Sequence, residues 1–530
     1  MRNNRIRMFC YFALPVLLLA ACVVHPSLAS AQMTSVGVDC SQIQAYQLLK
    51  QDNLGAGRVL IECGIVRGGQ PSTGTATKPP APPNIRVSNR ACSSSSTCTK
   101  SESMVSASTK NKGQTIVANY NDSTGTGSSY SGTSYSTDGG ATFHEIQPPP
   151  FENGHSFNAG DPIVIFNSKL GKFFAGDLAS GCGGFGIGLW TSTNGKTWTV
   201  GGCAHNGGSD DRESMWVDNE PTSGKYGRMY VSWNDFANNG ALSVAYSDDG
   251  NTWSSPVILN SNFIRDVQIT GSPRGAKLFE GKNSSVFVAA MDEGGGANNT
   301  RQNLMYKSLD GGVTWTSVTL GPRFNPPGDA ACSSNGYFWQ VNPIIRHMGW
   351  GEPAVGPNGV VHYVYAGAGK NGDHGDIYYQ RSADNGKTWS KAIKLNTDKD
   401  GQFKEQWMPS LSATSDGNIT ASWYDRRKAT SACNSVGDPG CNYERVGRQS
   451  KTNGTSWLAD ITISTHIIPQ PAQDDPTVVS CYAGDYDYNT ALSAADSSGT
   501  GTAYVTWTDG RRSVGGVHVQ DVDFAKVPEP

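Results

Sequence analysis

The sequence of 530 residues has few charged side chains and no excess of either sign. Charged residues make up 16% of the chain, and the formal net charge is −3 at pH 7. A nucleic-acid surface needs clustered Lys and Arg, so this balance argues against nucleic acid as a partner. No cysteine spacing has the CxxC form of a zinc site, and no nucleotide- or metal-binding motif occurs. We therefore expect neither cofactor nor metal.

Long apolar runs are also missing after the first 31 residues. None approaches the ~20 residues that a membrane-spanning helix needs. Gly, Ser, Thr and Asn are abundant instead, with 63 glycines in the chain. This composition suits short strands joined by many turns and gives little support to long helices. The chain is therefore expected to be all-β.

The first 31 residues are typical of an export signal. Arg2, Arg5 and Arg7 precede an apolar run over 9–21, and Ala29-Ser30-Ala31 fits a small-residue cleavage site. A competing reading is Leu19-Ala20-Ala21-Cys22, which resembles a bacterial lipobox and would anchor Cys22 to a membrane through lipid. We expect a secreted, periplasmic or cell-surface protein, with the membrane reached only through that lipid anchor.

Ten cysteines follow residue 31, an even number that suits an oxidising compartment. Short loops suggest the pairs 92–98, 182–203 and 433–441. The pairs 40–63 and 332–481 then follow by elimination.

One short frame recurs along the chain. It reads Ser382-x-Asp384-x-Gly386-x-Thr388-Trp389, and it returns at 308–315 and 136–143. A relative at 246–253 lacks only the leading hydroxyl, and the copies at 191–198 and 450–457 have Thr at the acidic position. An Asp that accepts backbone hydrogen bonds, a Gly with positive φ and a packed aromatic predict a hairpin turn. We assign these residues a structural role.

The frame is similar to the Asp-box of sialidase-type repeats, and the resemblance to Asp-box β-propellers covers residues 84–526. Six units of four strands each carry a box between strands three and four, at intervals of about 55 to 75 residues. A seventh unit, from residue 490 to 525, has three strands. Residues 85–87 are expected to supply its missing strand and to close the ring. The resemblance thus implies a single propeller of seven four-stranded blades, with six blades as the alternative.

The segments before the propeller divide into three. Residues 1–31 form the signal peptide, and 32–66 form a small appendage tied by a disulfide. Within the appendage, 41–50 has apolar positions at helical spacing. Residues 67–83 contain Gly, Pro, Ser and Thr and are expected to be a linker.

Carboxylates and arginines are expected to gather on the propeller face opposite the boxes. Acidic residues enter the first strands and leave the second strands of nearly every unit. A feature repeated in every blade favours a structural role, so residues that break the repeat are better candidates. Arg212, Tyr486, Tyr488 and the doubled arginines 426–427 and 511–512 would suit a polyhydroxylated or acidic ligand.

The resemblance to sialidases implies roles for some of these residues. Such enzymes hold the sugar carboxylate with three arginines, and they use a Tyr–Glu pair as nucleophile and an Asp as acid/base. The implied nucleophile is Tyr486 or Tyr488, with Glu352 as its partner and Asp161 as the acid/base. The family's Phe/Tyr-Arg-Ile-Pro motif is absent, and the nearest match is 85–88. The arginines expected to bind the substrate are Arg212, Arg426, Arg427, Arg511 and Arg512.

Two functions are compatible with these features. The first is an exported propeller that acts on glycans, in its narrowest form an exo-glycosidase of sialidase type. The alternative is a non-catalytic propeller that binds a carbohydrate or a protein. Either is expected to be a monomer with a glycan or glycoconjugate ligand.

Reduction of the paired cysteines should lower the melting temperature. A native disulfide contributes typically ~2–4 kcal/mol, and a longer closed loop contributes more. The largest loss is expected from the 332–481 pair, which spans the most residues. Scanning calorimetry with and without excess reductant measures the effect, and superimposable curves would contradict it.

Overall fold

The computed structural model describes residues 33–72, 84–124, 129–146, 155, 157–332, 335–342, 345–435 and 437–530. The expected signal peptide, with Cys22, and residues 73–83 of the expected linker lie outside them. The described residues contain one α-helix, α1 (Leu54–Glu62), short 3-10 turns and many antiparallel strands. The all-β prediction is confirmed. No helix in these ranges is long and apolar enough to cross a membrane.

Seven sheets of four or five strands make up most of the described structure, numbered here in chain order. Sheet 1 contains β2 (Lys100–Ala107), β3 (Ile116–Asp122), β4 (Ser131–Ser136), β5 (His144–Ile146) and β30 (Asp487–Tyr488). Sheet 2 contains β6 (Phe157–Asn158), β7 (Ile163–Asn167), β8 (Lys172–Ser180), β9 (Phe185–Ser192) and β10 (Thr199–His205). Sheet 3 contains β11 (Asp210–Val217), β12 (Met229–Asp235), β13 (Ala241–Ser247) and β14 (Val257–Phe263). Sheet 4 contains β15 (Arg265–Gly271), β16 (Val286–Asp292), β17 (Gln302–Ser308) and β18 (Thr316–Thr319).

The last three sheets follow the same plan. Sheet 5 contains β22 (Glu352–Val355), β23 (Val361–Gly367), β24 (Asp376–Ser382) and β25 (Ile393–Lys394). Sheet 6 contains β26 (Gln406–Ala413), β27 (Ile419–Asp425), β28 (Glu444–Ser450) and β29 (Ile461–Thr462). Sheet 7 contains β31 (Thr490–Leu492), β32 (Thr502–Asp509), β35 (Asp521–Pro528) and β1 (Ile85–Arg86). Two small sheets, β19 (Ala330–Cys332), β20 (Asn335–Asn342) and β21 (Ile345–Arg346), and β33 (Ser513–Val514) with β34 (Val517–His518), are insertions that the repeat did not predict.

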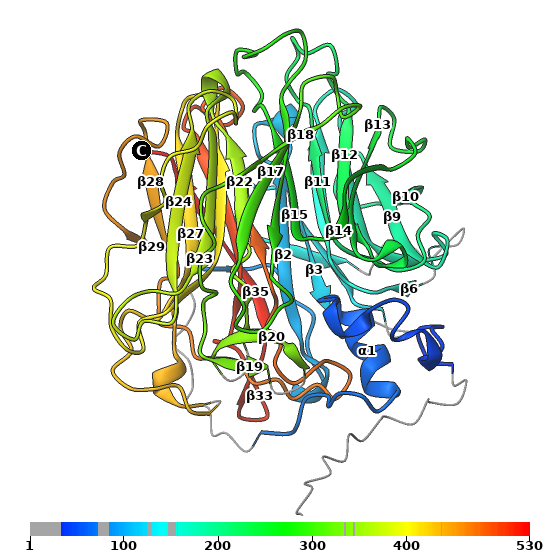
Figure 1. Cartoon of the computed structure of the whole chain (residues 1–530), viewed down its shortest axis with the longest axis vertical. Helices are drawn as coiled ribbons and strands as arrows, with labels where there is room; N and C mark the ends of the chain where they lie inside the picture. Colours follow the sequence, from blue (N-terminus) through cyan, green and yellow to red (C-terminus); the bar gives the residue numbers. More distant parts are fainter. Residues whose placement is uncertain are drawn as a thin grey trace, which may run out of the picture.

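The first strands of the seven sheets surround one cavity of about 200 Å³. Its lining includes residues of β2, β7, β11, β15, β22, β26 and β31, one strand from each sheet. The sheets therefore share a common axis. In Figure 1 their strands run roughly vertically, and α1, β19, β20 and β33 lie at the lower end of the molecule.

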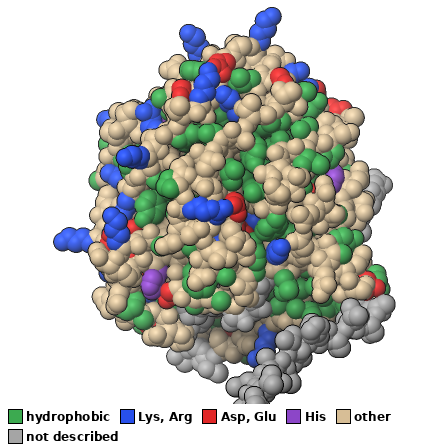
Figure 2. All heavy atoms as spheres, viewed as in Figure 1, with side chains coloured by type: hydrophobic (Ala, Val, Ile, Leu, Met, Phe, Trp, Pro, Cys, Tyr) green, Lys and Arg blue, Asp and Glu red, His purple; other side chains and the backbone are tan. Residues whose placement is uncertain are grey.

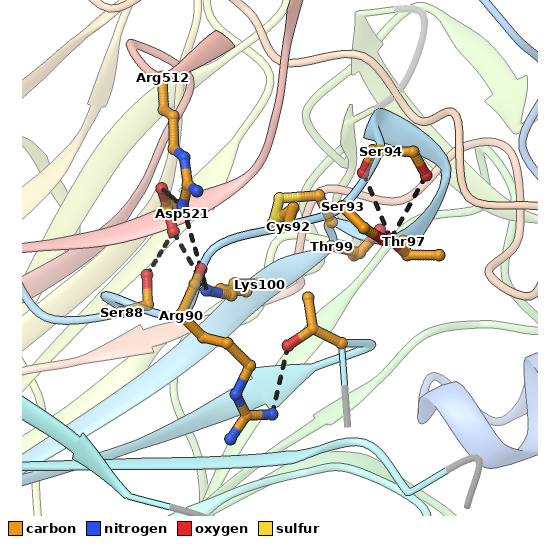
Figure 3. Close-up of a disulfide and its surroundings, with 12 residues drawn as sticks. Ser88, Arg90, Cys92, Ser93, Ser94, Thr97, Thr99, Lys100, Arg512 and Asp521 are labelled. Atoms are coloured by element: carbon orange, nitrogen blue, oxygen red, sulfur yellow. Dashed lines mark hydrogen bonds and ion pairs between the residues drawn. A yellow bond between two sulfur atoms is a disulfide. The ribbon is translucent and has the colours of Figure 1, made fainter. Parts of the chain in front are cut away.

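The two ends of the sheet region pair with each other, as predicted. Ile85 lies opposite Phe524 and Arg86 opposite Asp523 in the antiparallel pair of β1 and β35. Figure 3 shows the side chains beside this junction, where Ser88, Lys100 and Arg512 gather round Asp521. The Ser88 hydroxyl donates to Asp521 at 2.5 Å, and Arg512 lies 3.1 Å from its carboxylate. Burial makes these contacts strong, because water does not compete for them.

The repeated turns have the hydrogen bonds that the frame predicts. At Asp384 the carboxylate accepts from the backbone N–H of Thr388 at 2.9 Å. Burial raises the pKa of Asp384, but the hydrogen bonds from Thr388, Ser382 and Lys387 together outweigh it and lower the pKa to about 2. The Ser382 hydroxyl accepts from the N–H of Gly386 at 2.8 Å. The turn thus satisfies its own backbone donors with side chains two to four residues away.

Two of the six frames were placed one residue too early. The leading hydroxyl at the third sheet is Ser247, and Asp249 accepts from the N–H of Thr252 at 2.8 Å. Asp248, which had been assigned to the acidic position, pairs with Arg228 instead. At the second sheet Asn194 takes the acidic position and accepts from the N–H of Thr197 at 3.0 Å. These two turns are one residue shorter than the others, and the alignment by the final Trp hid the difference.

The glycine of each turn also spaces neighbouring sheets. Gly312 has φ +89°, and a Cβ atom there would lie 2.9 Å from the ring of Tyr230 in sheet 3. A Cβ on Gly250 would lie 2.2 Å from the ring of Phe174 in sheet 2. Any larger residue is excluded both by the backbone conformation and by the neighbouring sheet.

The described N-terminal residues, 33–72, form a segment that packs on the lower ends of the sheets; we call it the N-terminal segment. The helix expected over 41–50 is absent: short 3-10 turns at Cys40–Gln42 and Leu48–Lys50 flank Gln47, whose φ of +49° interrupts any helix. The α-helix comes later, at Leu54–Glu62, where Asn53 caps its N-terminus. Gly68, expected in a linker, bridges to Val479 and so belongs to the packed structure.

All five expected disulfides are present. Cys40 pairs with Cys63, and the other pairs are 92–98, 182–203, 332–481 and 433–441. The 332–481 bond joins β19 to the loop before sheet 7, both at the lower end. Figure 2 shows that uncharged side chains and backbone cover most of the face viewed, with charged side chains scattered among them and some of opposite sign in contact.

Removing Asp521 should destabilise the ring at its junction. Asp521→Ala leaves the buried Lys100 and the Arg512 guanidinium without this carboxylate, and breaking a buried ion pair costs about 3–5 kcal/mol. Denaturant unfolding measures the free energy of unfolding. Lys387→Ala is the control, because Lys387 pairs with Glu280 on the surface and should change the value by less than about 1 kcal/mol. Equal effects of the two substitutions would contradict this role for the junction.

Candidate functional site

The first strands share an irregularity near their lower ends. Glu102, Arg212 and Asp266 lie at register shifts in β2, β11 and β15, with φ of +48°, +52° and +59°. Asp161, just before β7, has φ +60°, and Met408 in β26 has φ +46°. Non-glycine residues rarely adopt this conformation, which costs of order 1 kcal/mol and clusters at functional sites. Four of these five residues are ionisable, and all of them are buried.

Carboxylates at this level bind the backbone of the next sheet. Asp161 accepts from the N–H of Arg212 at 2.7 Å, and Asp266 accepts from the N–H of Gly351 at 2.8 Å. The same type of bond recurs between further pairs: Glu352 with the Leu411 N–H at 2.8 Å, Asp487 with the Ser103 N–H at 3.0 Å, and Glu102 with the Asp485 N–H at 2.9 Å. Asp161, Asp266 and Glu352 therefore join neighbouring sheets, whereas Asp487 and Glu102 tie β30 and the residues before it to β2 within sheet 1.

Three arginines converge on one residue of the N-terminal segment, Asp52. Arg212 Nη1 lies 3.1 Å from Asp52 Oδ2, and Arg265 Nη2 lies 2.7 Å from Oδ1. Arg346 Nη2 donates to the Asp52 backbone carbonyl at 2.5 Å. Asp211 completes the group, since it pairs with Arg265 and accepts from the Asp52 N–H at 3.2 Å. We call Asp52, Asp211, Arg212, Arg265 and Arg346 the Asp52 cluster.

Aromatic rings hold Arg212 in position. Its guanidinium lies 4.0 Å from the ring centre of Trp350 and 4.9 Å from that of Tyr486. Tyr486 stacks on Tyr488 with ring centres 4.6 Å apart, and Arg212 Nη2 donates to the Tyr488 hydroxyl at 3.3 Å. Such stacking orients a guanidinium without using its hydrogen-bond donors.

The structure distributes the expected site residues over several places. Tyr488 and Tyr486 lie against Arg212, whereas the Tyr486 hydroxyl has no hydrogen-bond partner among the described residues. Glu352 accepts from Ser410 and Leu411, and no hydrogen bond joins it to either tyrosine in the described part of the chain. Asp161 lies beside Arg212, because its carboxylate accepts a hydrogen bond from the Arg212 backbone N–H.

The doubled arginines of the last two sheets bind carboxylates near them. Arg426 pairs with Glu405 at 2.7 Å, and Arg427 with Asp425 at 2.6 Å. Arg511 pairs with Asp509 and Asp523, and Arg512 with Asp521. An Asp precedes each pair of arginines, and one arginine of each pair binds it: Arg427 binds Asp425 and Arg511 binds Asp509, both two residues away. The arginines that meet at the axis are Arg212, Arg265 and Arg346.

Burial dominates the electrostatics of the axis. It raises the pKa of Glu102, Asp161 and Glu213, and nearby carboxylates raise these values further. Burial raises the pKa of Asp266 to about 6, although Arg212 opposes the shift. Asp52 differs: burial alone would raise its pKa, but Arg265 and Arg212 hold it well below its usual range. Asp52 is therefore charged while several of its neighbours keep their protons.

Two groups of carboxylates have oxygens close enough for a metal ion. One is Asp52, Asp161 and Asp211, and the other is Asp373, Asp376 and Asp400. In the first group Arg212 and Arg265 pair with Asp52, and Arg265 also pairs with Asp211. In the second group Lys394 pairs with Asp376 and Asp400. The positive charge that a metal would contribute is thus supplied by side chains.

Comparison with known proteins finds similarity at the level of solved structures only. No protein-family model and no curated protein sequence matches the chain. An ulvan lyase of polysaccharide lyase family 25 shares 11% identity at TM-score 0.44, covering 82% of this chain and 95% of its own. An α-L-arabinofuranosidase from Fusarium graminearum shares 14% at TM-score 0.37, covering 69% and 91%. An intramolecular trans-sialidase from Ruminococcus gnavus shares 14% at TM-score 0.37, covering 82% and 95%. At such values similarity says nothing about activity, so function is inferred from the contacts of this chain.

Sequence reasoning missed Asp52 and Arg265. Asp52 lies in a segment outside the repeat. Arg265 is the first residue of β15, a strand that was predicted to begin only at residue 267. One signal was available for Arg265. Arg265 and Asp266 are adjacent at the start of β15, just as Asp211 and Arg212 are adjacent near the start of β11.

The protein should be more stable at mildly acidic than at alkaline pH. Asp177, fully buried in β8, has its pKa raised by burial to about 8. A raised pKa means that the folded state binds the proton more tightly, so stability falls as pH rises from about 4 to 8, by at most about 1.4 kcal/mol per pH unit for one proton. Denaturant unfolding from pH 5 to 9 measures the slope.

Asp177→Asn should reduce this slope by about one proton, because the amide cannot ionise. The matched control is Asp416→Asn in an exposed turn, which should leave the slope unchanged. A slope in Asp177→Asn equal to that of the wild type would show that Asp177 does not hold its proton.

Proposed function

We propose that the chain is an exported, seven-bladed Asp-box β-propeller that acts on acidic glycans outside the cytoplasm. Its site is the Asp52 cluster, in which Arg212, Arg265 and Arg346 bind a carboxylate. The observation that carries the proposal is the convergence of three buried guanidinium groups on one aspartate.

The propeller part is supported by the common axis of seven sheets and by the pairing of β1 with β35. A four-stranded antiparallel sheet is one blade, and pairing of the two ends in a single sheet removes exposed edges. The side-chain hydrogen bonds of the turns between third and fourth strands support the Asp-box assignment. Five disulfides support an oxidising compartment, and hence the signal over 1–31, with lipid attachment at Cys22 as the alternative.

A carboxylate is the chemical group that this cluster fits. Arginine presents planar pairs of N–H donors that match carboxylate oxygens, and it stays charged when buried. Each guanidinium also pairs with one carboxylate outside the N-terminal segment, Arg212 with Asp266, Arg265 with Asp211 and Arg346 with Asp485, so the carboxylate of Asp52 is an additional anion at the site. An acidic sugar offers one carboxylate and several hydroxyls, and the buried oxygens of Asp161 and Glu213 that lack hydrogen bonds are acceptors for hydroxyls.

In the narrower, catalytic form of the proposal the protein is an exo-glycosidase. Tyr488 or Tyr486 would be the nucleophile, Glu352 its base and Asp161 the acid. Support comes from the contact of Tyr488 with Arg212 and from the raised pKa of Asp161, because a buried acid that keeps its proton can donate it to a leaving group. Burial raises the pKa of Glu352 to about 8, which weakens it as a base at neutral pH. This observation favours the alternative, a propeller that binds the acidic sugar without cleaving it.

Binding and turnover are tested with the 4-methylumbelliferyl glycosides of N-acetylneuraminic acid, glucuronic acid and glucose. Asp52 fills the arginine site, so the assay uses both the wild type and Asp52→Ala. We expect the acidic glycosides to bind and the glucoside not to bind. Arg212→Lys keeps the charge but loses the paired donors, and it should weaken binding by about 10- to 100-fold, since a hydrogen bond to a charged group contributes about 1.5–3 kcal/mol.

Release of methylumbelliferone separates the two forms of the proposal. Turnover that Tyr488→Phe abolishes while binding persists would establish a glycosidase. Binding without turnover would establish a binding module. If a correctly folded Asp52→Ala protein binds neither acidic glycoside, the proposed function is wrong.

A further inference from the structure

The N-terminal segment is tied to itself but not to the sheets. Its disulfide, Cys40–Cys63, joins two of its own residues. The other four disulfides join cysteines of residues 92–481. Within the described residues the segment is therefore held to the sheets by non-covalent contacts and by continuity of the chain alone.

The segment places Asp52 at the axis through a short rigid structure. Asn53 caps α1 by accepting from the Ala56 N–H at 2.7 Å, and its side-chain amide donates to Asp211 at 2.6 Å. On the other side of Asp52, the Gln51 amide donates to the Ser209 hydroxyl at 2.7 Å. Asp52 is thus fixed by a bond from each neighbour to sheet 3.

Apolar packing supports the same position. Leu54, Val59 and Leu60 of α1 are each 2% exposed and belong to one core cluster with Leu178, Met215 and Tyr482 from the ends of the sheets. In Figure 1 α1 lies at the lower end of the molecule, below β3 and β6. The segment covers the end of the axis at which the arginines gather.

Asp52 makes the contacts that a ligand carboxylate would make. Its two oxygens bind two different arginines, and the low pKa keeps the group charged. The third arginine binds its backbone carbonyl, a neutral oxygen that corresponds to a hydroxyl or carbonyl of a ligand. Every one of these interactions would be lost if the segment moved away, and each would be regained from an acidic sugar.

We propose that the N-terminal segment is a built-in inhibitor whose Asp52 occupies the arginine site as a substitute for the ligand carboxylate. The inference rests on the proposed function. A competitor attached to the same chain acts at an effective concentration of about millimolar or above. The ligand's apparent dissociation constant then equals its intrinsic value divided by the fraction of molecules in which the site is free. Ligand and segment therefore exclude each other, and the ligand's affinity reports how firmly the segment is held.

The first experiment compares the wild type with Asp52→Ala by isothermal titration with N-acetylneuraminic acid and glucuronic acid. Loss of Asp52 removes the two ion pairs, so the segment yields more readily and the apparent affinity should rise at least tenfold. Asp39→Asn is the matched control, because Asp39 lies in the same segment and only caps the turn at Cys40–Gln42. It should bind as the wild type does.

The second experiment observes the segment itself in the wild-type protein, so it does not depend on a variant that folds. Amide hydrogen exchange of residues 54–62 is measured with and without glucuronic acid. Displacement should speed exchange there by at least tenfold, and glucose at the same concentration should have no effect. Slower or unchanged exchange in the presence of bound glucuronic acid would overturn the proposal that the N-terminal segment is an inhibitor.

The two failures are distinguishable. If the wild type and a folded Asp52→Ala protein bind the acidic sugars with equal affinity, the segment is not an inhibitor and the proposed function stands. If Asp52→Ala does not fold, a wild-type chain with a specific protease site placed between residues 72 and 84 is cut after folding, and its affinity is compared with that of the uncut chain. Equal affinity again overturns the inhibitor, and no binding by any form overturns the proposed function.

Discussion

Hydrogen bonds from side-chain carboxylates to the backbone of a neighbouring sheet hold the axis together. The first strands line the common axis but belong to different sheets, so no ladder of backbone hydrogen bonds joins one first strand to the next among the described residues. The bulge at Asp266 supplies such a connection, since its carboxylate accepts from the Gly351 N–H at the start of sheet 5, and the bulge at Glu102 ties the residues before β30 to β2 in the same way. The positive φ at these positions is thus the cost of these connections.

This arrangement explains how acidic residues can be so abundant at the axis. A carboxyl that accepts a backbone N–H need not be charged, and burial favours its protonated form, as the raised pKa of Asp161 indicates. The arginines meet only some of these groups. Asp52 is the exception, because two guanidinium groups keep it ionised. Burial thus favours the protonated form of several carboxyls at the axis, whereas the arginines favour the charged form of Asp52.

Much of the fold follows from local patterns in the sequence. Most strands of the seven sheets, the pairing of 85–87 with the last sheet and the five disulfides were predicted, because turns, alternation and cysteine spacing are local or countable features; the short strands β6 and β30 were not predicted. The helix was misplaced, since apolar spacing over 41–50 gave no sign that Gln47 would adopt φ +49°.

The site was harder to predict because its members share no local pattern. Arg212 and Tyr488 were singled out, but their contact joins residues that are 276 positions apart in the sequence. The doubled arginines attracted attention as a departure from the repeat, yet each pairs with a carboxylate away from the Asp52 cluster, such as Asp425 beside Arg427. Asp52 belongs to a segment without repeats, and only its position in space gives it a role.

The pairing of β1 with β35 also has a consequence for how the molecule is made. Ile85 emerges early in synthesis and must wait for Phe524, so the ring of sheets stays open, with exposed strand edges, until almost the whole sheet region exists. Contacts between such distant residues slow folding, and open edges invite association with other chains. A protein exported before it folds would close this ring only after translocation, which makes chaperones of the destination compartment, rather than those of the cytoplasm, the ones that protect its unpaired edges.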